Sequence, residues 1–167
     1  MTLKLLNESG EERIKNELKN CCGAQKWVTD MASRFPFSDS KMLYEKAEEV
    51  WKNCSEKDWL EAFEHHPKIG DLKSLEKKFA STKEWAGGEQ AGVNTASRKI
   101  IEQLAEKNAD YERKFGYIFI VCATGKSAVE MLQILNSRLP NKPEDEIKIA
   151  AAEQAKITKI RLQKLLK

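Results

Sequence analysis

Two short segments of the chain carry side chains that could do acid–base chemistry. His66 stands directly before Pro67, and a proline disfavours the helical conformation for the residue before it, so we expect His66 at a helix end. Glu89 follows Gly87 and Gly88, whose backbone freedom suits a turn from which a helix begins. An imidazole and a carboxylate brought together from two helix ends could move a proton. The spacing permits this site, and purely structural roles stay open.

His66 and Glu89 could each have a purely structural role at a helix end. On a helix that begins at Ser55, His66 shares a face with Trp59 and Phe63, so it could simply cap the helix end. The C-terminus of a helix also favours the imidazolium form, which suits a proton donor. Glu89 falls in the first turn of its helix, where a carboxylate is stabilised by the helix dipole in any case.

Three further features could hold a ligand. Gln90 offers both a donor and an acceptor, which suits an amide- or urea-like ligand. Arg161 lies one turn from Ile157 and Leu165 in the last expected helix, so its guanidinium either extends to water or binds a buried anion. The run 117–123 is β-branched and aromatic, which is typical of an extended buried segment. Its backbone could contact a flat heterocycle, or the run could only pack in the core.

The rest of the pattern is helical. Serines followed three residues later by Glu or Asp predict helix starts at Ser9, Ser55 and Ser127, and Ser38 is expected to cap another helix. Apolar residues recur at helical spacing between these starts and the prolines, and Pro143 begins the last helix. The sequence predicts an all-α, single-domain multi-helix bundle over residues 1–167, with one short extended buried segment.

Composition narrows the class of protein. The chain has 167 residues, 41% hydrophobic and 33% charged, which is ordinary for one globular domain. The net charge of +3 is spread along the chain, so we expect no nucleic-acid partner. The four cysteines form no zinc-ligand spacing with the histidines, so we expect reduced, buried thiols, no metal and a cytoplasmic location. No apolar run approaches the ~20 residues of a membrane span.

Four short segments, taken in order, resemble one known family. They are His66-Pro67-x-Ile69-Gly70, Glu89-Gln90-Ala91-Gly92, Lys114-Phe115-Gly116-Tyr117-x-Phe119-Ile120-Val121-Cys122-Ala123 and Ile160-Arg161-Leu162. Together they resemble the 2-oxo-4-hydroxy-4-carboxy-5-ureidoimidazoline (OHCU) decarboxylase family, which acts on the route from urate to (S)-allantoin. The resemblance covers nearly the whole chain. It implies an all-helical homodimer that uses no cofactor and takes OHCU as its substrate.

The resemblance also implies roles for individual residues. His66 would be the proton donor, and Glu89 and Arg161 would orient the substrate. The family usually has a serine where this chain has Ala86, so a hydroxyl contact is lost or supplied elsewhere. Many members also carry arginine where this chain has Thr124. The other substrate-binding positions that it implies are Pro67, Ala86, Gly87, Gly88, Gln90, Phe119, Ile120, Val121, Cys122 and Ala123.

Two other functions are also compatible with parts of the sequence. A helical binding or scaffold module without catalysis would explain the helices and the charge, and would treat His66, Glu89 and Arg161 as incidental. A 5-hydroxyisourate hydrolase of the same pathway would be rich in β-structure, so a helical fold would exclude it.

Overall fold

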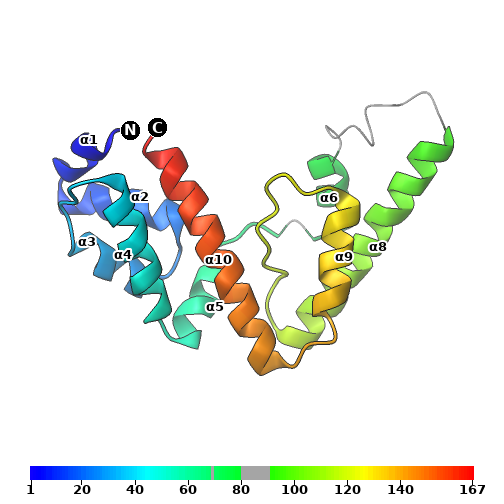
Figure 1. The fold of residues 1–167 in the computed structure, drawn as a ribbon. Helices are drawn as coiled ribbons and strands as arrows, with labels where there is room; N and C mark the ends of the chain where they lie inside the picture. The colour runs from blue at the N-terminus through cyan, green and yellow to red at the C-terminus, as the bar shows by residue number, and fades with distance from the viewer. Residues whose placement is uncertain (69, 80–90) are drawn as a thin grey trace. The chain divides into compact units, whose positions relative to one another are not determined.

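Within the residues that the structure describes, the chain forms nine α-helices and no strand. The computed structural model describes residues 1–68, 70–79 and 91–167, and of residues 91–96 it describes the backbone alone. The all-α fold is therefore confirmed. Figure 1 shows the helices, which are α1 (Leu3–Asn7), α2 (Glu11–Cys21), α3 (Gln25–Ala32), α4 (Ser40–Lys52), α5 (Glu56–Glu64), α6 (Leu72–Phe79), α8 (Ala91–Phe115), α9 (Ala128–Arg138) and α10 (Pro143–Leu165).

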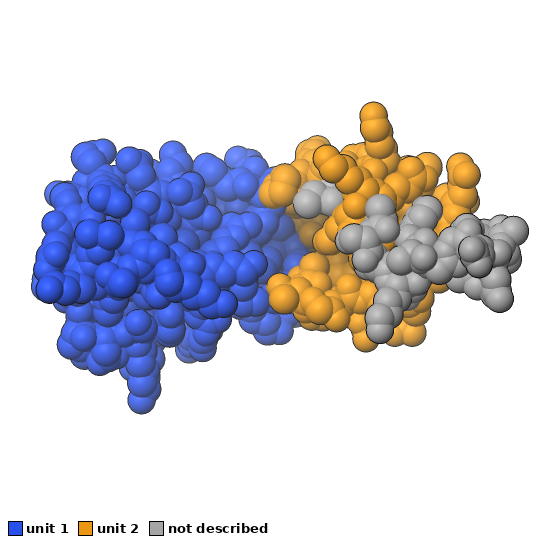
Figure 2. Space-filling view, turned by 90° about the horizontal axis from the view of Figure 1, so that it is seen from above, with its two compact units in different colours: residues 1–66, 120–122, 149–167 blue, residues 67–119, 123–148 orange. Residues whose placement is uncertain are grey.

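These helices divide into two compact units, which Figure 2 colours separately. Unit 1 comprises residues 1–66, 120–122 and 149–167, and unit 2 comprises residues 67–119 and 123–148. Helix α10 begins in unit 2 and continues into unit 1. A single domain over the whole chain stays a prediction.

Two of the predicted helix starts have the expected geometry. Ser55 accepts a hydrogen bond from the backbone N–H of Asp58, whose carboxylate accepts one from the backbone N–H of Ser55. Ser127 and Glu130 make the same reciprocal pair at the start of α9. Each pair satisfies two backbone donors that a helix start would otherwise leave unbonded. These two starts are confirmed, as is the start of α10 at Pro143.

The other two predicted starts are wrong by one residue. The Ser9 hydroxyl donates to the carbonyl oxygen of Leu5, so Ser9 bonds back to the preceding helix and Gly10 caps α2 without a side-chain bond. A serine can satisfy its hydroxyl in this way whenever a helical turn precedes it. At α4, the side chain of Asp39 caps the helix, and the Ser38 hydroxyl donates to that carboxylate.

Two buried tryptophans join three helices of unit 1. The indole N–H of Trp27 in α3 donates to the carbonyl oxygen of Ala47 in α4, at 3.1 Å. The indole N–H of Trp51 in α4 donates to the carbonyl oxygen of Ala151 in α10, at 2.8 Å. Each indole buries a large apolar ring while its polar N–H stays bonded, which avoids the cost of an unpaired donor. These bonds hold α3, α4 and α10 together.

Unit 2 buries a charged cluster between α8, α9 and the start of α10. Glu146 is 0% exposed and accepts hydrogen bonds from the hydroxyl of Tyr111, from the guanidinium of Arg138 and from the amide of Asn141. The Arg138 guanidinium also lies 4.7 Å from the ring centroid of Phe119. We call Tyr111, Arg138 and Glu146 the buried ion cluster. Because each charge has a partner, the cluster avoids the full penalty of an isolated buried charge.

The run 117–123 contains no helix and is only partly buried. Ile120 and Cys122 are buried, and the other residues of the run are half-buried. All four cysteines of the chain are free and buried. Burial raises the pKa of the Cys21 thiol to about 11 and that of Cys22 to about 12, so both remain protonated thiols. None of the described helices is long and apolar enough to cross a membrane.

Candidate active site

One face of α10 in unit 1 carries polar side chains at buried positions. Gln154 is 0% exposed, Thr158 is 5% exposed and Arg161 is half-buried. Residues four and seven positions apart lie on the same helix face, so the three side chains form one row. Polar groups inside a protein cost free energy unless they are hydrogen-bonded. Their partners come from the ends of α5 and α2.

His66 follows the last turn of α5 and is held by Gln154. Its Nε2 atom lies 2.5 Å from Oε1 of Gln154, across 88 positions of the sequence. The amide nitrogen of Gln154 donates in turn to the hydroxyl oxygen of Thr158, at 3.1 Å. His66 is half-buried, whereas its neighbour His65 is exposed. This agrees with the expectation that His66 shares a helix face with Phe63, which is buried.

The charge state of His66 differs from the one that the helix end suggested. The pKa of His66 is lowered from 6.5, first because burial penalises the charged ring and then because Arg161 and His65 add positive charge nearby. The hydrogen bond between His66 and the amide oxygen of Gln154 acts in the opposite direction. Burial thus has the largest effect and favours the neutral ring, so the expectation of a stabilised imidazolium is wrong for the protein without a ligand.

Arg161 bonds the end of α2, and its charge acts on the pKa of His66. Its Nη1 atom donates to the carbonyl oxygen of Cys21, the last residue of α2, at 3.3 Å. Its positive charge also acts to lower the pKa of the Cys21 and Cys22 thiols against the larger effect of burial. Within the described residues, Arg161 forms no ion pair with a carboxylate. A guanidinium with one bond to a neutral carbonyl keeps several N–H donors for an anion.

Unit 1 also contains residues 120–122 of the run 117–123, and α10 holds them there. The backbone N–H of Cys122 donates to Oε2 of Glu153, at 2.8 Å. Glu153 precedes Gln154 on α10, so adjacent residues of one helix hold the extended run and His66. That N–H is therefore already bonded within the protein. Backbone contacts to a ligand would have to use other groups of the run.

The predicted site residues fall into three sets. Unit 1 brings together His66, Arg161, Ile120, Val121 and Cys122. Unit 2 contains Pro67, which is exposed, Ala123, which is half-buried, and Phe119, whose ring packs edge-on against Tyr111 with centroids 5.2 Å apart. The third set, comprising Ala86, Gly87, Gly88, Glu89 and Gln90, lies outside the described residues.

Sequence reasoning missed Gln154, Thr158 and Glu153. A signal for the first two was present, because both lie on the same helical face as Arg161, which was singled out as a polar residue among apolar ones. The partner of Gln154 could not be inferred in this way, since a hydrogen bond across 88 positions leaves no local pattern. The same holds for the bond between Glu153 and Cys122.

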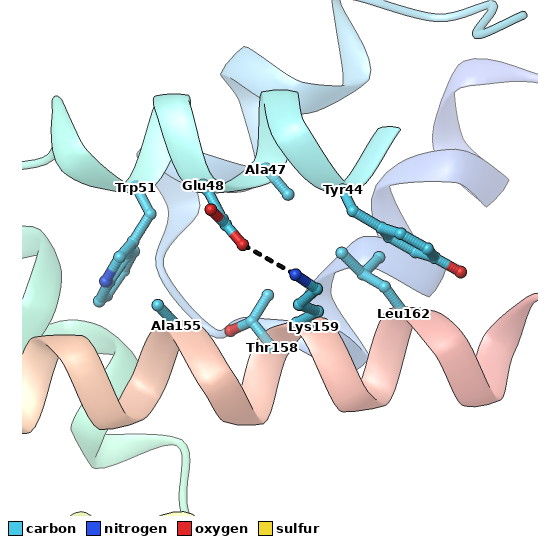
Figure 3. A pocket seen from close by; sticks show the side chains of 8 residues that line it. All are labelled: Tyr44, Ala47, Glu48, Trp51, Ala155, Thr158, Lys159 and Leu162. Atoms are coloured by element: carbon cyan, nitrogen blue, oxygen red, sulfur yellow. Dashed lines mark hydrogen bonds and ion pairs between the residues drawn. The ribbon is translucent and has the colours of Figure 1, made fainter. Parts of the chain in front are cut away.

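A separate hollow of about 240 Å³, partly open to solvent, lies between α4 and α10 of unit 1. In Figure 3 the carboxylate of Glu48 and the ammonium of Lys159 meet at its edge, with N···O 3.2 Å. Only Thr158 is shared with the row that holds His66, and Arg161 is not in its lining. Its lining residues are Tyr44, Ala47, Glu48, Trp51, Ala155, Thr158, Lys159 and Leu162. The ionisable side chains of the hollow are therefore Tyr44 and the surface ion pair of Glu48 and Lys159.

Metal ligation has no support in the described residues. They contain no group of three or more His, Cys, Asp or Glu side chains that could hold a metal ion.

Comparisons with known proteins agree with this fold over nearly the whole chain. A sequence model of the family described as OHCU decarboxylase matches residues 7–163. The uric acid degradation bifunctional protein TTL of Arabidopsis thaliana is 38% identical over 152 residues, which cover 90% of this chain. That match covers 47% of the relative, so the chain spans about half the length of this curated relative.

Two further matches span nearly the full length of both chains. A 2-oxo-4-hydroxy-4-carboxy-5-ureidoimidazoline decarboxylase of Halalkalicoccus jeotgali is 25% identical over 166 residues, covering 99% of this chain and 92% of the relative. A solved structure described as OHCU decarboxylase in the presence of (S)-allantoin superposes with a TM-score of 0.71 at 35% identity. It covers 95% of this chain and 99% of the other.

Proposed function

Since this chain belongs to the OHCU decarboxylase family, we propose that it is a carboxy-lyase that converts OHCU to (S)-allantoin without a cofactor, as a step of urate degradation. The observation that carries the proposal is that His66 and Arg161 both lie beside one face of α10 in unit 1, where the charge of Arg161 acts on the pKa of His66. The names of the relatives, which refer to uric acid degradation and OHCU decarboxylation, point to the same reaction. The 5-hydroxyisourate hydrolase alternative is excluded by the helical fold.

Arg161 is proposed to bind the substrate as an anion. OHCU carries a carboxylate and carbonyl oxygens, and a guanidinium offers planar, bidentate hydrogen bonds to such groups. Its present bond goes to the neutral carbonyl oxygen of Cys21, and Arg161 has no ion-pair partner in the described part of the chain. The half-buried setting supports this role, because charge–charge attraction is stronger away from bulk water.

His66 is proposed to deliver the proton that replaces the carboxylate. When the substrate loses carbon dioxide, the electron pair of the broken C–C bond moves into the adjacent imine-like carbon–nitrogen system and leaves an enol-type intermediate. Protonation of that intermediate on one face gives one enantiomer of allantoin. An imidazolium can donate this proton and become neutral imidazole. The low pKa of His66 without ligand fits the role, because a bound anion beside the ring raises it again.

The remaining residues are proposed for binding and orientation. Glu89 would orient the substrate together with Arg161, and the resemblance also assigns Glu89 a catalytic role. The resemblance likewise supports substrate contacts for Pro67, Ala86, Gly87, Gly88, Gln90, Phe119, Ile120, Val121, Cys122 and Ala123. It further supports a homodimer, and the free, buried thiols of the four cysteines support a cytoplasmic location.

The test is to mix the purified protein with OHCU that is freshly generated from urate, and to follow circular dichroism of the product. The expected result is faster formation of optically active allantoin than in the same mixture without the protein, where the spontaneous product is racemic. If the rate and the optical activity match the protein-free mixture, the decarboxylase proposal is wrong. In that case the chain is a helical binding module, the alternative that the sequence left open.

A further inference from the structure

We propose that Gln154 is a positioning residue that fixes the imidazole of His66 with hydrogen on Nε2, so that Nδ1 is the atom that exchanges a proton with the ligand. The contact between the two side chains is a property of the structure. The statement about proton exchange rests on the decarboxylase function proposed above.

The orientation of the Gln154 amide decides which nitrogen of His66 carries hydrogen. The amide NH₂ of Gln154 donates to the hydroxyl oxygen of Thr158, so the amide oxygen is the atom that faces His66. An amide oxygen can only accept a hydrogen bond. At 2.5 Å from that oxygen, Nε2 of His66 must therefore be the donor in the neutral ring as well as in the charged one.

Burial keeps this arrangement from exchanging with water. Gln154 is 0% exposed and Thr158 is 5% exposed. A reversed amide would present its NH₂ to Nε2, which would then have to accept, so the neutral ring would carry hydrogen on Nδ1 instead. The two amide orientations therefore predict opposite tautomers of His66, and the structure has the amide oxygen on His66 and the amide nitrogen on Thr158.

The second nitrogen of His66 is free for a ligand. Within the described residues, Nδ1 of His66 has no hydrogen-bond partner, and it does not belong to the side-chain atoms that are both buried and unpaired. It is therefore open to a molecule from solvent. The nearby positive charge of Arg161 would attract an anionic molecule to the same side chain.

The neighbouring His65 supplies an internal comparison. Its Nδ1 lies 2.9 Å from the carbonyl oxygen of Glu61, which can only accept, so neutral His65 carries hydrogen on Nδ1. The two histidines of the chain are thus expected to be opposite tautomers. The imidazole ¹⁵N chemical shifts distinguish a protonated from an unprotonated nitrogen, and with only two histidines the signals can be assigned by His65→Asn alone.

The test is ¹⁵N NMR of the full chain about two pH units above the ordinary imidazole pKa, where neutral rings dominate. We expect hydrogen on Nε2 in His66 and on Nδ1 in His65. In Gln154→Met, which removes the acceptor, we expect His66 to become a mixture of tautomers. In Gln154→Glu, which keeps an acceptor, we expect hydrogen to remain on Nε2. Gln163→Met is the matched control, since Gln163 is an exposed residue of the same helix.

The kinetic constants kcat and KM distinguish a positioning role of Gln154 from a purely structural one. Gln154→Met is expected to lower kcat about tenfold with little change in KM, the size of effect of one hydrogen bond. Gln154→Glu is expected to recover part of that loss. If Gln154→Met does not fold, Thr158→Val serves instead, because it frees the amide to reverse and should also mix the tautomers of His66.

Two results would overturn the proposal. One is hydrogen on Nδ1 of neutral His66 in the unmodified protein. The other is an unchanged His66 spectrum in both Gln154→Met and Thr158→Val. The spectra can be recorded without any catalytic turnover, so they are independent of the test of function. An inactive protein with the expected tautomers would contradict the decarboxylase proposal but would still support the role of Gln154 in fixing the His66 tautomer.

Discussion

Unit 2 buries Arg138 and Glu146 almost completely and surrounds the carboxylate with three donors. Unit 1 holds His66 and Arg161 half-buried, and within the described residues Nδ1 of His66 and several N–H groups of Arg161 have no hydrogen-bond partner. Both regions remove ionisable groups from water, but in the described part of the chain the buried ion cluster pairs its charges and Arg161 does not. The difference separates two uses of a buried charge. A fully paired group contributes to one defined packing, and an incompletely paired group keeps bonding capacity for a ligand.

The pKa of Tyr111 reflects the burial of the ion cluster in unit 2. Burial raises the pKa of Tyr111 far above its ordinary value, and the hydrogen bond to Glu146 raises it further. Tyr111 therefore stays protonated and acts as a permanent donor to that carboxylate. In unit 1, by contrast, the pKa of His66 is lowered, which leaves a group that gains or loses a proton when its surroundings change.

The largest expected effect is on stability, from breaking the buried ion cluster. Glu146→Leu leaves the Arg138 guanidinium buried without its carboxylate, which should lower the free energy of unfolding by about 3–5 kcal/mol. The double variant Glu146→Leu, Arg138→Met should recover most of this loss, because two apolar side chains replace both charges. Urea-induced unfolding measures both. A single variant as stable as the unmodified protein would show that the cluster does not stabilise unit 2.

The second-largest expected effect is a weaker binding of the substrate when Arg161 is replaced. Arg161→Gln removes the charge proposed to bind the substrate carboxylate, so KM should rise roughly 10- to 100-fold, the value of hydrogen bonds to a charged group. The free energy of unfolding should change little, since Arg161 is half-buried and makes one bond to a carbonyl oxygen. Steady-state kinetics measure KM, and Arg98→Gln, an exposed arginine of α8, is the control.

Arg161→Lys should give an intermediate KM, because an ammonium keeps the charge and loses the planar pair of donors. If Arg161→Gln left KM unchanged and clearly lowered the free energy of unfolding, Arg161 would have a structural role, as Arg138 does, and would not bind the substrate.

The fold could be predicted from the sequence more completely than the site. Local signals sufficed for the starts at Ser55 and Ser127 and for the start of the last helix at Pro143, because caps and prolines act within a few residues. The same signal failed at Ser9, where an unpredicted helix, α1, precedes the serine and offers a carbonyl for its hydroxyl.

The site needed information that no local pattern holds. Arg161 could be singled out because its charge interrupts an apolar helix face. Its neighbour Gln154 is bonded to His66 across 88 positions, and its role depends on that contact. The pKa of His66 was predicted in the wrong direction, because the helix dipole can be inferred from sequence while the extent of burial cannot.

The smallest expected effect is on the pH dependence of stability. The pKa of His66 is lower in the folded protein than its ordinary 6.5, so the unfolded chain binds the proton more readily. The free energy of unfolding should therefore fall as the pH drops from above 6.5 through the folded pKa of His66. His66→Asn removes this contribution, so its stability should fall less over the same range. Equal pH dependence in both proteins, measured by urea unfolding, would contradict the lowered pKa.

The central claim is that His66, held in unit 1, delivers the proton that sets the handedness of the product. The most direct test is the enantiomeric composition of allantoin formed by His66→Asn, with His65→Asn as the matched neighbour that is exposed and bonded elsewhere. The account predicts a nearly racemic product and a rate lowered about 10²- to 10⁴-fold for His66→Asn, and (S)-allantoin at close to the unmodified rate for His65→Asn. A His66→Asn protein that still forms (S)-allantoin at full rate would contradict it.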